Sequence, residues 1–448
     1  MEKNLTTGGV LRNIVGFSLP YLLSYFLQTL YGMADLFIIG QFSGTADITA
    51  VSIGSQVMHM LTVMIVGLAM GATIAIGRAV GAGEKERAAL AIGNSAALFM
   101  AVAAVLTAAL LALVRPIVAV MSTPAEAAEG AVQYLTICFA GIPFITAYNV
   151  ISSIFRGLGD SKSPMYFVAV ACAANIGLDY LFIGWLGMGP AGAALGTTLS
   201  QTLSVAAALA VILRQKTGLP LRKDSFRPRR DVMGPILRVG VPVTLQDGFI
   251  QVSFILITII ANSRGLNDAA AVGIVEKVIS FVFLVPSSML STVSALAAQN
   301  VGAGKHDRAA QTLRYAVGIC LAFGLAVGVL VQFIAGEIVA VFDSTPAVVA
   351  AGSQYIRGYI WDCMFAGVHF SFSGYFCAYG RSGVSFLHNA LAIVLVRIPG
   401  AYLMSRLFPE TLLPMGCAAT AGSLLSVAVC GAAFLWLRRR GLLEQAAT

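Results

Sequence analysis

Chemistry in this 448-residue chain is expected where carboxylate, amide and hydroxyl side chains interrupt long apolar stretches. Asp35 follows Ser24, Gln28 and Tyr31 at the i, i+4 and i+7 spacing of one α-helix face. Pro20 lies one turn before Ser24 and predicts a helix kink with a freed carbonyl. This face therefore predicts a polar stripe that ends at a carboxylate.

Two further polar pairs repeat the same helical spacing. Asn175 and Asp179 are four residues apart, and so are Thr197 and Gln201. Two carboxylates, an amide and a hydroxyl can hold one small cation, or equally a proton, since adjacent carboxylates cannot both stay ionised. The alternative is that these side chains only join helices by hydrogen bonds or line water.

The elements that must position these residues are membrane-spanning helices. Of the chain, 58% is hydrophobic and only 11% is charged, whereas soluble domains carry about 25% charged residues. This composition excludes an ordinary soluble enzyme, a nucleic-acid-binding protein and a disordered chain. Long continuous apolar runs also differ from the short alternating segments of a closed barrel. We expect an all-α polytopic membrane protein with twelve transmembrane helices, at about 14–40, 51–75, 88–114, 131–155, 165–186, 189–213, 236–262, 269–297, 310–334, 354–379, 385–407 and 415–437.

A direct repeat divides these spans into two halves. The segment 80–89 (VGAGEKERAA) matches 301–310 (VGAGKHDRAA) at seven of ten positions, with an offset of 221 residues. Because each half has six spans, the repeat is parallel and predicts two six-helix bundles related by a pseudo-two-fold axis along the membrane normal. The predicted domains are an N-lobe at 1–213 with the cation or proton site, a basic cytoplasmic linker at 214–234, and a C-lobe at 235–448.

The second half has no copy of the polar constellation. At the offset of 221, Asp35 corresponds to Leu256, Asn175 to Val396 and Asp179 to Gly400. A structural role common to both halves would have left polar residues in both. Ion chemistry is therefore expected in the first half.

The second half carries its own charges. Asp247 and Lys277 could form an ion pair, because an unpaired charge at membrane depth is costly; the pair could serve packing or coupling. Asp362 and Arg397 are placed within their spans or near the ends. Isolated histidines such as His369 are expected to join helices by hydrogen bonds, and we expect no metal site.

Basic residues predict the topology. Most of the lysines and arginines fall in one alternating set of loops and termini, whereas Arg115, Arg264 and Arg406 fall in the opposite set. Both termini are therefore predicted to be cytoplasmic, and the formal charge of +8 records this bias rather than nucleic-acid binding. The chain has no Walker motif, so ATP is not expected, and no catalytic constellation, so an enzyme is not expected.

The chain resembles the multidrug and toxic compound extrusion (MATE) family of bacterial antiporters. The resemblance depends on Pro20 with Asp35, the surrounding segment 32–40 (GMADLFIIG), the duplicated VGAG turns, the segment 155–160 (FRGLGD), and Asn175 with Asp179. It implies a V-shaped molecule with a central cavity. It also implies a cation or proton site at Asp35, Asn175, Asp179 and Thr197.

The resemblance further implies export of small amphipathic, often cationic, compounds in exchange for H⁺ or Na⁺, with no other cofactor. Candidates to line the substrate cavity are Gln28, Tyr31, Asn149, Ser153, Gln201, Asp247, Lys277 and His369. The expected protein is a multi-pass monomer of the bacterial inner membrane. The alternative within the same superfamily is a flippase for a lipid or a lipid-linked precursor. A channel is disfavoured, because a channel has no need of two duplicated halves.

Overall fold

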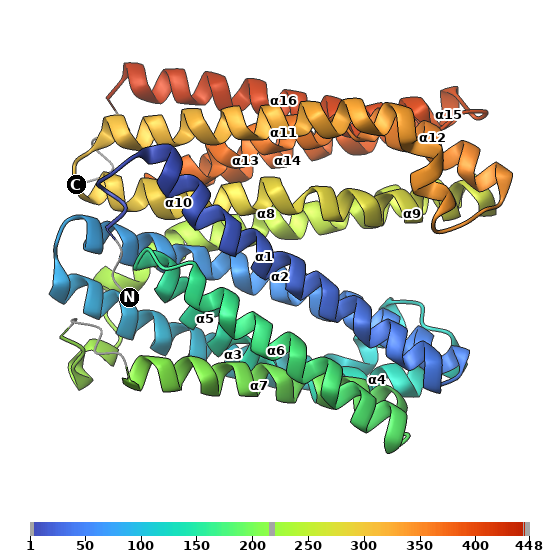
Figure 1. Ribbon diagram of the computed structural model, residues 1–448, viewed down its shortest axis with the longest axis horizontal. Helices are drawn as coiled ribbons and strands as arrows, with labels where there is room; N and C mark the ends of the chain where they lie inside the picture. The colour runs from blue at the N-terminus through green and yellow to red at the C-terminus, as the bar shows by residue number, and fades with distance from the viewer. Residues whose placement is uncertain (1–3, 215–219, 442, 444–448) are drawn as a thin grey trace. The chain divides into compact units, whose positions relative to one another are not determined.

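The computed structural model describes residues 4–214, 220–441 and 443, and these residues are overwhelmingly helical (Figure 1). Among them, ten helices are long and apolar enough to cross a membrane, and the bent pair α4 (Ala125–Ala140) and α5 (Ile142–Gly157) makes eleven. The twelfth predicted span, at 354–379, falls on α12 (Pro346–Tyr359) and α13 (Asp362–Ala378), which correspond to α4 and α5 in the repeat but are not counted among these eleven by length and composition. The prediction of an all-helical, multi-pass membrane protein is confirmed.

The first six spans are formed by eight described elements. They are α1 (Val10–Phe42), α2 (Thr45–Gly81), α3 (Lys85–Val120), α4 (Ala125–Ala140), α5 (Ile142–Gly157), α6 (Lys162–Asp179), the π-helix η1 (Tyr180–Trp185) and α7 (Gly189–Arg214), followed by the short 3₁₀-helix η2 (Lys223–Phe226). Of the predicted linker at 214–234, residues 215–219 lie outside the described residues, and α8 begins within the remainder, at Arg230.

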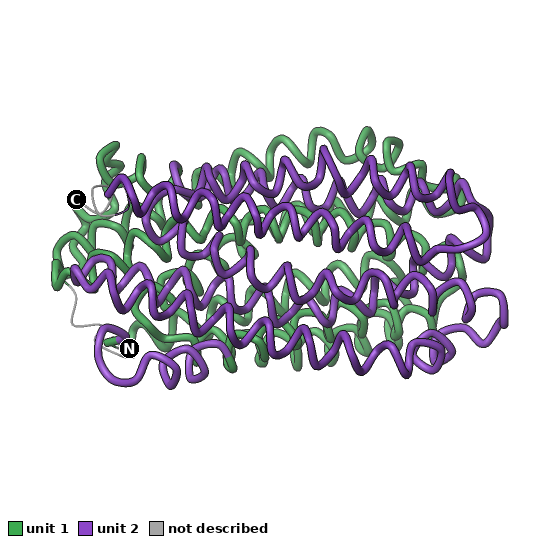
Figure 2. The backbone as a smooth tube through the Cα atoms, turned by 90° about the horizontal axis from the view of Figure 1, so that it is seen from above, with its two compact units in different colours: residues 1–4, 19–237 green, residues 5–18, 238–448 purple. Residues whose placement is uncertain are grey.

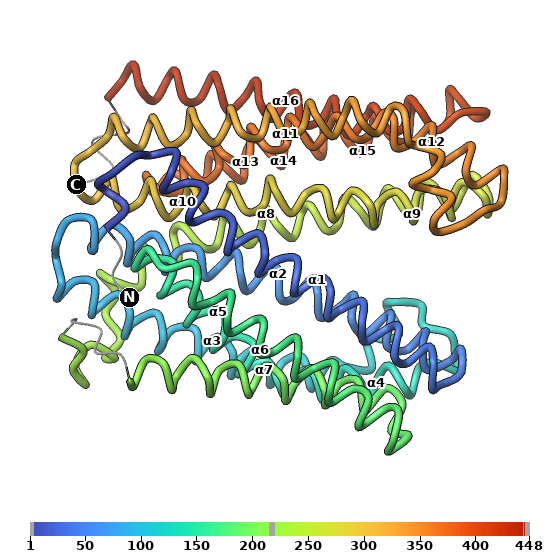
Figure 3. Tube along the Cα trace, in the orientation of Figure 1, coloured from blue at the N-terminus to red at the C-terminus, as the bar shows by residue number. Residues whose placement is uncertain are grey.

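The last six spans contain ten described elements, because the second span is divided into two helices and the fifth span continues as an α-helix after its π-helix. They are α8 (Arg230–Asn262), α9 (Leu266–Val282), α10 (Leu284–Gly302), α11 (His306–Ala340), α12 (Pro346–Tyr359), α13 (Asp362–Ala378), α14 (Ser382–Ala392), the π-helix η3 (Ile393–Arg397), α15 (Ile398–Leu407) and α16 (Leu413–Arg439). Figure 3 traces the short connections between consecutive helices.

Duplicated glycines end the helices at equivalent points. Gly83 and Gly304 have φ of 74° and 70°, and Gly159 and Gly380 have φ of 87° and 70°. A positive φ is accessible to glycine at little cost, which lets the chain turn while the following N–H reaches back to a helix carbonyl. The N–H of Glu84 donates to Ala79 in this way. The repeated residues therefore form the same glycine-containing turn after a helix in each half.

Both halves also interrupt their fourth and fifth spans. The axis bends by 48° between α4 and α5, at Gly141. In the second half, α12 ends at Tyr359 and α13 begins at Asp362, which is Gly141 plus 221. A π-helical segment follows in each fifth span, η1 in the first half and η3 in the second. Such irregular segments open a helix to side chains and are frequent at functional sites.

The described chain forms two compact units (Figure 2). Unit 1 contains residues 1–4 and 19–237, and unit 2 contains residues 5–18 and 238–448. The predicted boundaries differ from these at two places, because residues 5–18, predicted in the N-lobe, belong to unit 2, and residues 235–237, predicted in the C-lobe, belong to unit 1.

Hydrogen bonds explain why the N-terminal segment joins unit 2. The N–H of Leu5 donates to Oε1 of Gln299 at 3.0 Å, and Nζ of Lys305 donates to the carbonyl of Thr6 at 2.9 Å. Arg308 donates to the carbonyl of Gly8. In unit 1, Asn94 holds the segment before α8 in a similar way, since its Nδ2 donates to the carbonyl of Ser225. Each first span therefore begins on the unit formed by the other half of the chain.

Pro20 lies beside this change of unit and does not interrupt α1, which runs as one helix from Val10 to Phe42. The Ser24 hydroxyl donates to the carbonyl of Pro20 at 2.9 Å. Ser24 is thus used within its own helix.

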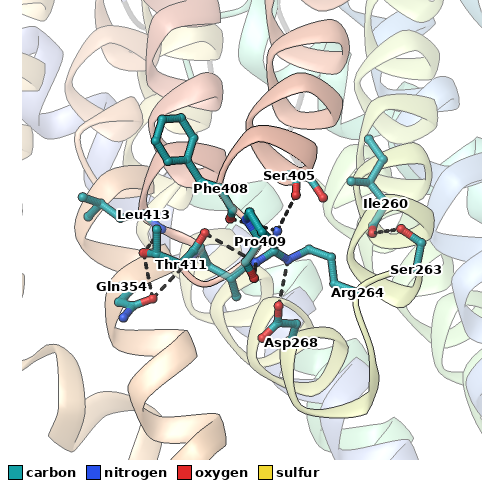
Figure 4. Close-up of polar contacts among 11 residues, drawn as sticks. Ile260, Ser263, Arg264, Asp268, Gln354, Ser405, Phe408, Pro409, Thr411 and Leu413 are labelled. Atoms are coloured by element: carbon teal, nitrogen blue, oxygen red, sulfur yellow. Dashed lines mark hydrogen bonds and ion pairs between the residues drawn. The ribbon is translucent and has the colours of Figure 1, made fainter.

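One arginine fixes the far end of unit 2 (Figure 4). Arg264 follows α8, and its Nε donates to Oδ2 of Asp268 at 2.7 Å. Its two terminal nitrogens donate to the carbonyls of Ser405, Phe408, Pro409 and Thr411. The sequence placed Arg264 as a loop charge, but its side chain is only 7% exposed. It joins the α8–α9 connection to the α15–α16 connection.

Candidate functional site

The predicted polar residues of the first half meet at one place inside unit 1. Asp35 on α1 lies next to Asp179, the last residue of α6, and to Asn175 one turn earlier. The Thr197 hydroxyl on α7 is 3.1 Å from Oδ2 of Asp35. Asp35 is 3% exposed, and Asp179 and Asn175 are fully buried. The i, i+4 pairs of the sequence have become a cluster shared by three helices.

Most polar atoms of this cluster have no hydrogen-bond partner among the described residues. They are Oδ1 of Asp35, both carboxylate oxygens of Asp179, and both Oδ1 and Nδ2 of Asn175. Ionised carboxylates only accept hydrogen bonds, so two of them side by side cannot satisfy one another. A proton or a small cation between them would satisfy these oxygens.

A glycine on α7 makes room for the Asp179 carboxylate. A Cβ atom at Gly196 would overlap Oδ1 of Asp179. Because α6 and α7 pack closely at this point, the acid can be accommodated only beside a residue without a side chain. Gly196 is a site residue that the sequence reasoning missed, and its position one residue before Thr197 was the available signal.

The Thr197 hydroxyl has a second neighbour. Its Oγ1 is 3.0 Å from the carbonyl of Ala193, one turn earlier on α7. A hydroxyl has one proton, so it can donate to Ala193 or to Asp35 but not to both at once. When it donates to Ala193, a lone pair is free to coordinate a cation beside Asp35. Thr197 can therefore serve either a proton or a metal ion.

Tyr31 and Gln201 extend the cluster along α1 and α7. Nε2 of Gln201 lies 3.3 Å from the Tyr31 hydroxyl, while Oε1 of Gln201 is buried with no partner among the described residues. Gln28, one turn before Tyr31, lies near Tyr148 of α5. The predicted stripe on α1 is thus half-buried at Gln28 and Tyr31 and buried at Asp35.

Asn149 and Ser153 do not join the acidic cluster by hydrogen bonds. Nδ2 of Asn149 donates to the carbonyl of Ile145, and the Ser153 hydroxyl donates to that of Val150, both within α5. The backbone carbonyl of Ser153 accepts from the Thr73 hydroxyl of α2. The side-chain hydrogen bonds of Asn149 and Ser153 therefore stabilise α5 and do not reach the acidic cluster.

The polar candidates of unit 2 lie apart from one another. Asp247 on α8 is half-buried and Lys277 on α9 is exposed, and no salt bridge within 4.0 Å joins them among the described residues. The ion pair considered from the sequence is therefore absent. His369 is buried on α13, where its Nε2 lies 3.3 Å from the Ser423 hydroxyl. This contact fits the expected role of joining helices.

The buried ion pair of unit 2 instead involves Asp362 and Arg397. Nη2 of Arg397 lies 3.3 Å from Oδ2 of Asp362, which is fully buried. Span boundaries drawn from the sequence left both near helix ends. The signal that could have found them is the repeat, because Asp362 corresponds to Gly141 at the break of the fourth span.

Two six-span halves, a buried carboxylate pair in one half and irregular fourth and fifth spans in both define a polytopic membrane protein of the duplicated transporter type. The MatE family model matches residues 20–181 and 242–403, once in each half. The chain belongs to this family.

Relatives cover nearly the whole chain. It is 29% identical over 402 residues to the "Probable multidrug resistance protein YpnP" of Bacillus subtilis (strain 168), covering 90% of both chains. It is 25% identical to a "Probable multidrug resistance protein NorM" of Thermotoga maritima, covering 90% of this chain and 87% of the relative. It is also 24% identical to a "FAD transporter" of Shewanella oneidensis, covering 90% of both chains.

Solved structures share the fold. A structure described as "MATE in complex with MaL6" aligns with a TM-score of 0.88 at 23% identity and covers 99% of both chains. Another, described as "MATE in the bent conformation", aligns with a TM-score of 0.89 and covers 99% of this chain and 98% of that one. Together with the family match, these similarities confirm the predicted family and its helical repeat architecture.

Proposed function

We propose that this chain is a secondary antiporter that exports amphipathic, often cationic, compounds in exchange for H⁺ or Na⁺. The observation that supports this most is the pair of adjacent buried carboxylates, Asp35 and Asp179, because three of their four oxygens lack partners among the described residues. A purely structural polar cluster would satisfy its own hydrogen bonds. The names of the multidrug resistance relatives support the substrate class.

In this mechanism the ion enters at Asp35 and Asp179 and changes the charge between α1 and α6. Substrate is released when the ion is bound, and the unloaded carboxylates favour substrate uptake. An ion can shift such an equilibrium only by its differential affinity for the two states. The site suits this role because it joins α1, α6 and α7, and α1 passes from one unit to the other at Ser18 and Leu19.

The test is dye efflux from proteoliposomes that contain the purified full-length protein. A fluorescent cationic dye is followed while a pH gradient and a Na⁺ gradient are imposed separately, which decides the coupling ion. Asp35→Asn should abolish the gradient-driven component. Asp224→Asn is the matched control, because that carboxylate is 75% exposed. Normal gradient-driven efflux by the Asp35→Asn variant would exclude the mechanism.

We further propose that the protein is a monomer of the bacterial inner membrane with both termini cytoplasmic. The asymmetry of Lys and Arg supports this orientation. A reporter that is active only in the cytoplasm, fused after residue 448, tests the C-terminal side. A reporter that is folded but inactive would place the C-terminus outside the cytoplasm and contradict the proposed orientation.

A further inference from the structure

Unit 2 holds a permanent positive charge, Arg397, beside the buried carboxylate of Asp362. Nη2 of Arg397 donates to the Tyr359 hydroxyl at 2.6 Å and lies 3.3 Å from Oδ2 of Asp362. The guanidinium carbon is 5.4 Å from the ring centroid of Phe254 and 5.6 Å from that of Tyr359. A carboxylate, a hydroxyl and two aromatic faces are ligands that suit a small cation.

Arg397 lies at the position in unit 2 that corresponds in the repeat to the acidic cluster of unit 1. At the offset of 221, Arg397 corresponds to Ile176, the residue after Asn175. Both lie in fifth spans, beside or within the π-helical part. Unit 1 presents two carboxylates there with no basic side chain in the cluster, whereas unit 2 supplies the cation from its own chain.

A second acid faces this charge. Glu276 on α9 interacts electrostatically with Arg397, and its Oε2 lies 3.4 Å from the Thr258 hydroxyl. The other oxygen, Oε1, is buried with no partner among the described residues. Arg397 therefore forms an ion pair with Asp362, and the Glu276 carboxylate lies within electrostatic range of it.

The bonding of Arg397 differs from that of a structural arginine. Arg264 uses all three of its nitrogens, on Asp268 and four carbonyls. Arg397 makes both of its hydrogen bonds through Nη2, and its buried Nε has no partner among the described residues, although the residue is only 9% exposed. A group that served packing alone would be expected to use more of its five donors.

We infer that Arg397 is a tethered cation that occupies a monovalent-cation site of unit 2 formed by Asp362, Tyr359, Phe254 and Glu276. Removing the side chain exposes this site to free guanidinium-type and alkali cations. In the native protein the site takes no ion from solution. The corollary that unit 1 alone holds the coupling ion rests on the proposed function, whereas the site itself does not.

The experiment uses purified full-length protein and follows thermal unfolding, which requires no transport. Arg397→Ala should lower the Tm, and methylguanidinium at low millimolar concentration should restore at least half of the loss, with Na⁺ or K⁺ restoring less. Arg264→Ala is the matched control, since its partners are mainly carbonyls near a connection. It should lose stability and gain nothing selectively from the added cation.

Two further variants keep the inference testable. Arg397→Lys retains a tethered charge and should show no response to methylguanidinium. Arg397→Gln replaces Arg397→Ala if the latter does not fold, and the same rescue is expected. In the double variant Arg397→Gln with Asp362→Asn the rescue should disappear. Equal effects of methylguanidinium on the Arg397→Gln and Arg264→Ala variants, or no effect on Arg397→Gln, would overturn the inference. Failure of the Asp35→Asn efflux test would leave this result unchanged.

Discussion

The two units differ in how their buried carboxylates are paired. In unit 1, Asp35 and Asp179 lie side by side, and three of their four carboxylate oxygens lack partners among the described residues. In unit 2, Asp362 is paired with Arg397. Charge inside a membrane protein must be neutralised. Unit 2 does so with its own side chain. Under the proposed function, unit 1 takes up a proton or cation from outside, so we expect one exchanging site and one closed site.

The largest expected effect is the loss of ion coupling when either acid of unit 1 is neutralised. Asp179→Asn should reduce gradient-driven efflux by about 100-fold or more, the equivalent of about 3 kcal/mol of ion-binding free energy. The comparison variant is Asp247→Asn in unit 2, because Asp247 forms no ion pair with Lys277. Efflux rates in proteoliposomes measure both, and coupling lost equally in both would break the comparison.

Unit 2 should instead lose stability. Removing one partner of a buried pair costs about 3–5 kcal/mol, because the other charge remains buried and unpaired. Asp362→Leu should therefore lower the free energy of unfolding by about this amount. Adding Arg397→Met should recover most of the loss, since apolar replacement of a whole buried pair is often neutral. Chemical unfolding of the purified protein measures both, and an additive loss in the double variant would contradict the pairing.

Gly196 allows a smaller test of the unit 1 site. Gly196→Ala should cost about 1–3 kcal/mol, as overpacking does in a filled core, because its Cβ would overlap the Asp179 carboxylate. The ion concentration that half-saturates efflux should also shift. Gly177→Ala on α6 is the matched control, since nothing lies within 4 Å of its Cβ position. Identical ion dependence in both variants would mean that Asp179 moves freely.

The sequence was sufficient for features that repeat locally. Helical spacing predicted the polar faces of Asp35, Asn175 with Asp179, and Thr197 with Gln201, and the structure brings these faces together. The VGAG repeat predicted two halves, because equivalent glycine caps require equivalent residues. Such features depend on neighbours along the chain, which a single sequence displays.

Features that depend on partners far apart along the chain were not predicted. The Arg397–Asp362 pair joins residues from two spans, and neither residue reveals its depth within its own span. Residues 5–18 read as the start of the first half, although Gln299, Lys305 and Arg308 hold the segment just before α1 on unit 2. Polar residues of a chain end carry no periodic pattern, so only the tertiary hydrogen bonds disclose their location.

The smallest expected effect separates the two duplicated turns. Glu84 and Lys305 are equivalent at the offset of 221, but Glu84 pairs only with Arg87, where the side chains are 48% and 71% exposed. Lys305 instead donates to the carbonyl and the hydroxyl oxygen of Thr6. Lys305→Ala should cost about 1 kcal/mol, as for a typical hydrogen bond, and should speed amide hydrogen exchange at residues 5–8.

Glu84→Ala should cost less than about 0.5 kcal/mol, because exposed ion pairs contribute little to stability. Its amide exchange at residues 5–8 should match that of the unsubstituted protein. Since the two turns share the same backbone caps, a difference between the variants must come from the segment that Lys305 holds. Equal amide exchange rates in the Lys305→Ala and Glu84→Ala variants would mean that Lys305 is not needed to hold residues 5–8. The hydrogen bonds of Gln299 and Arg308 would then be sufficient for this attachment.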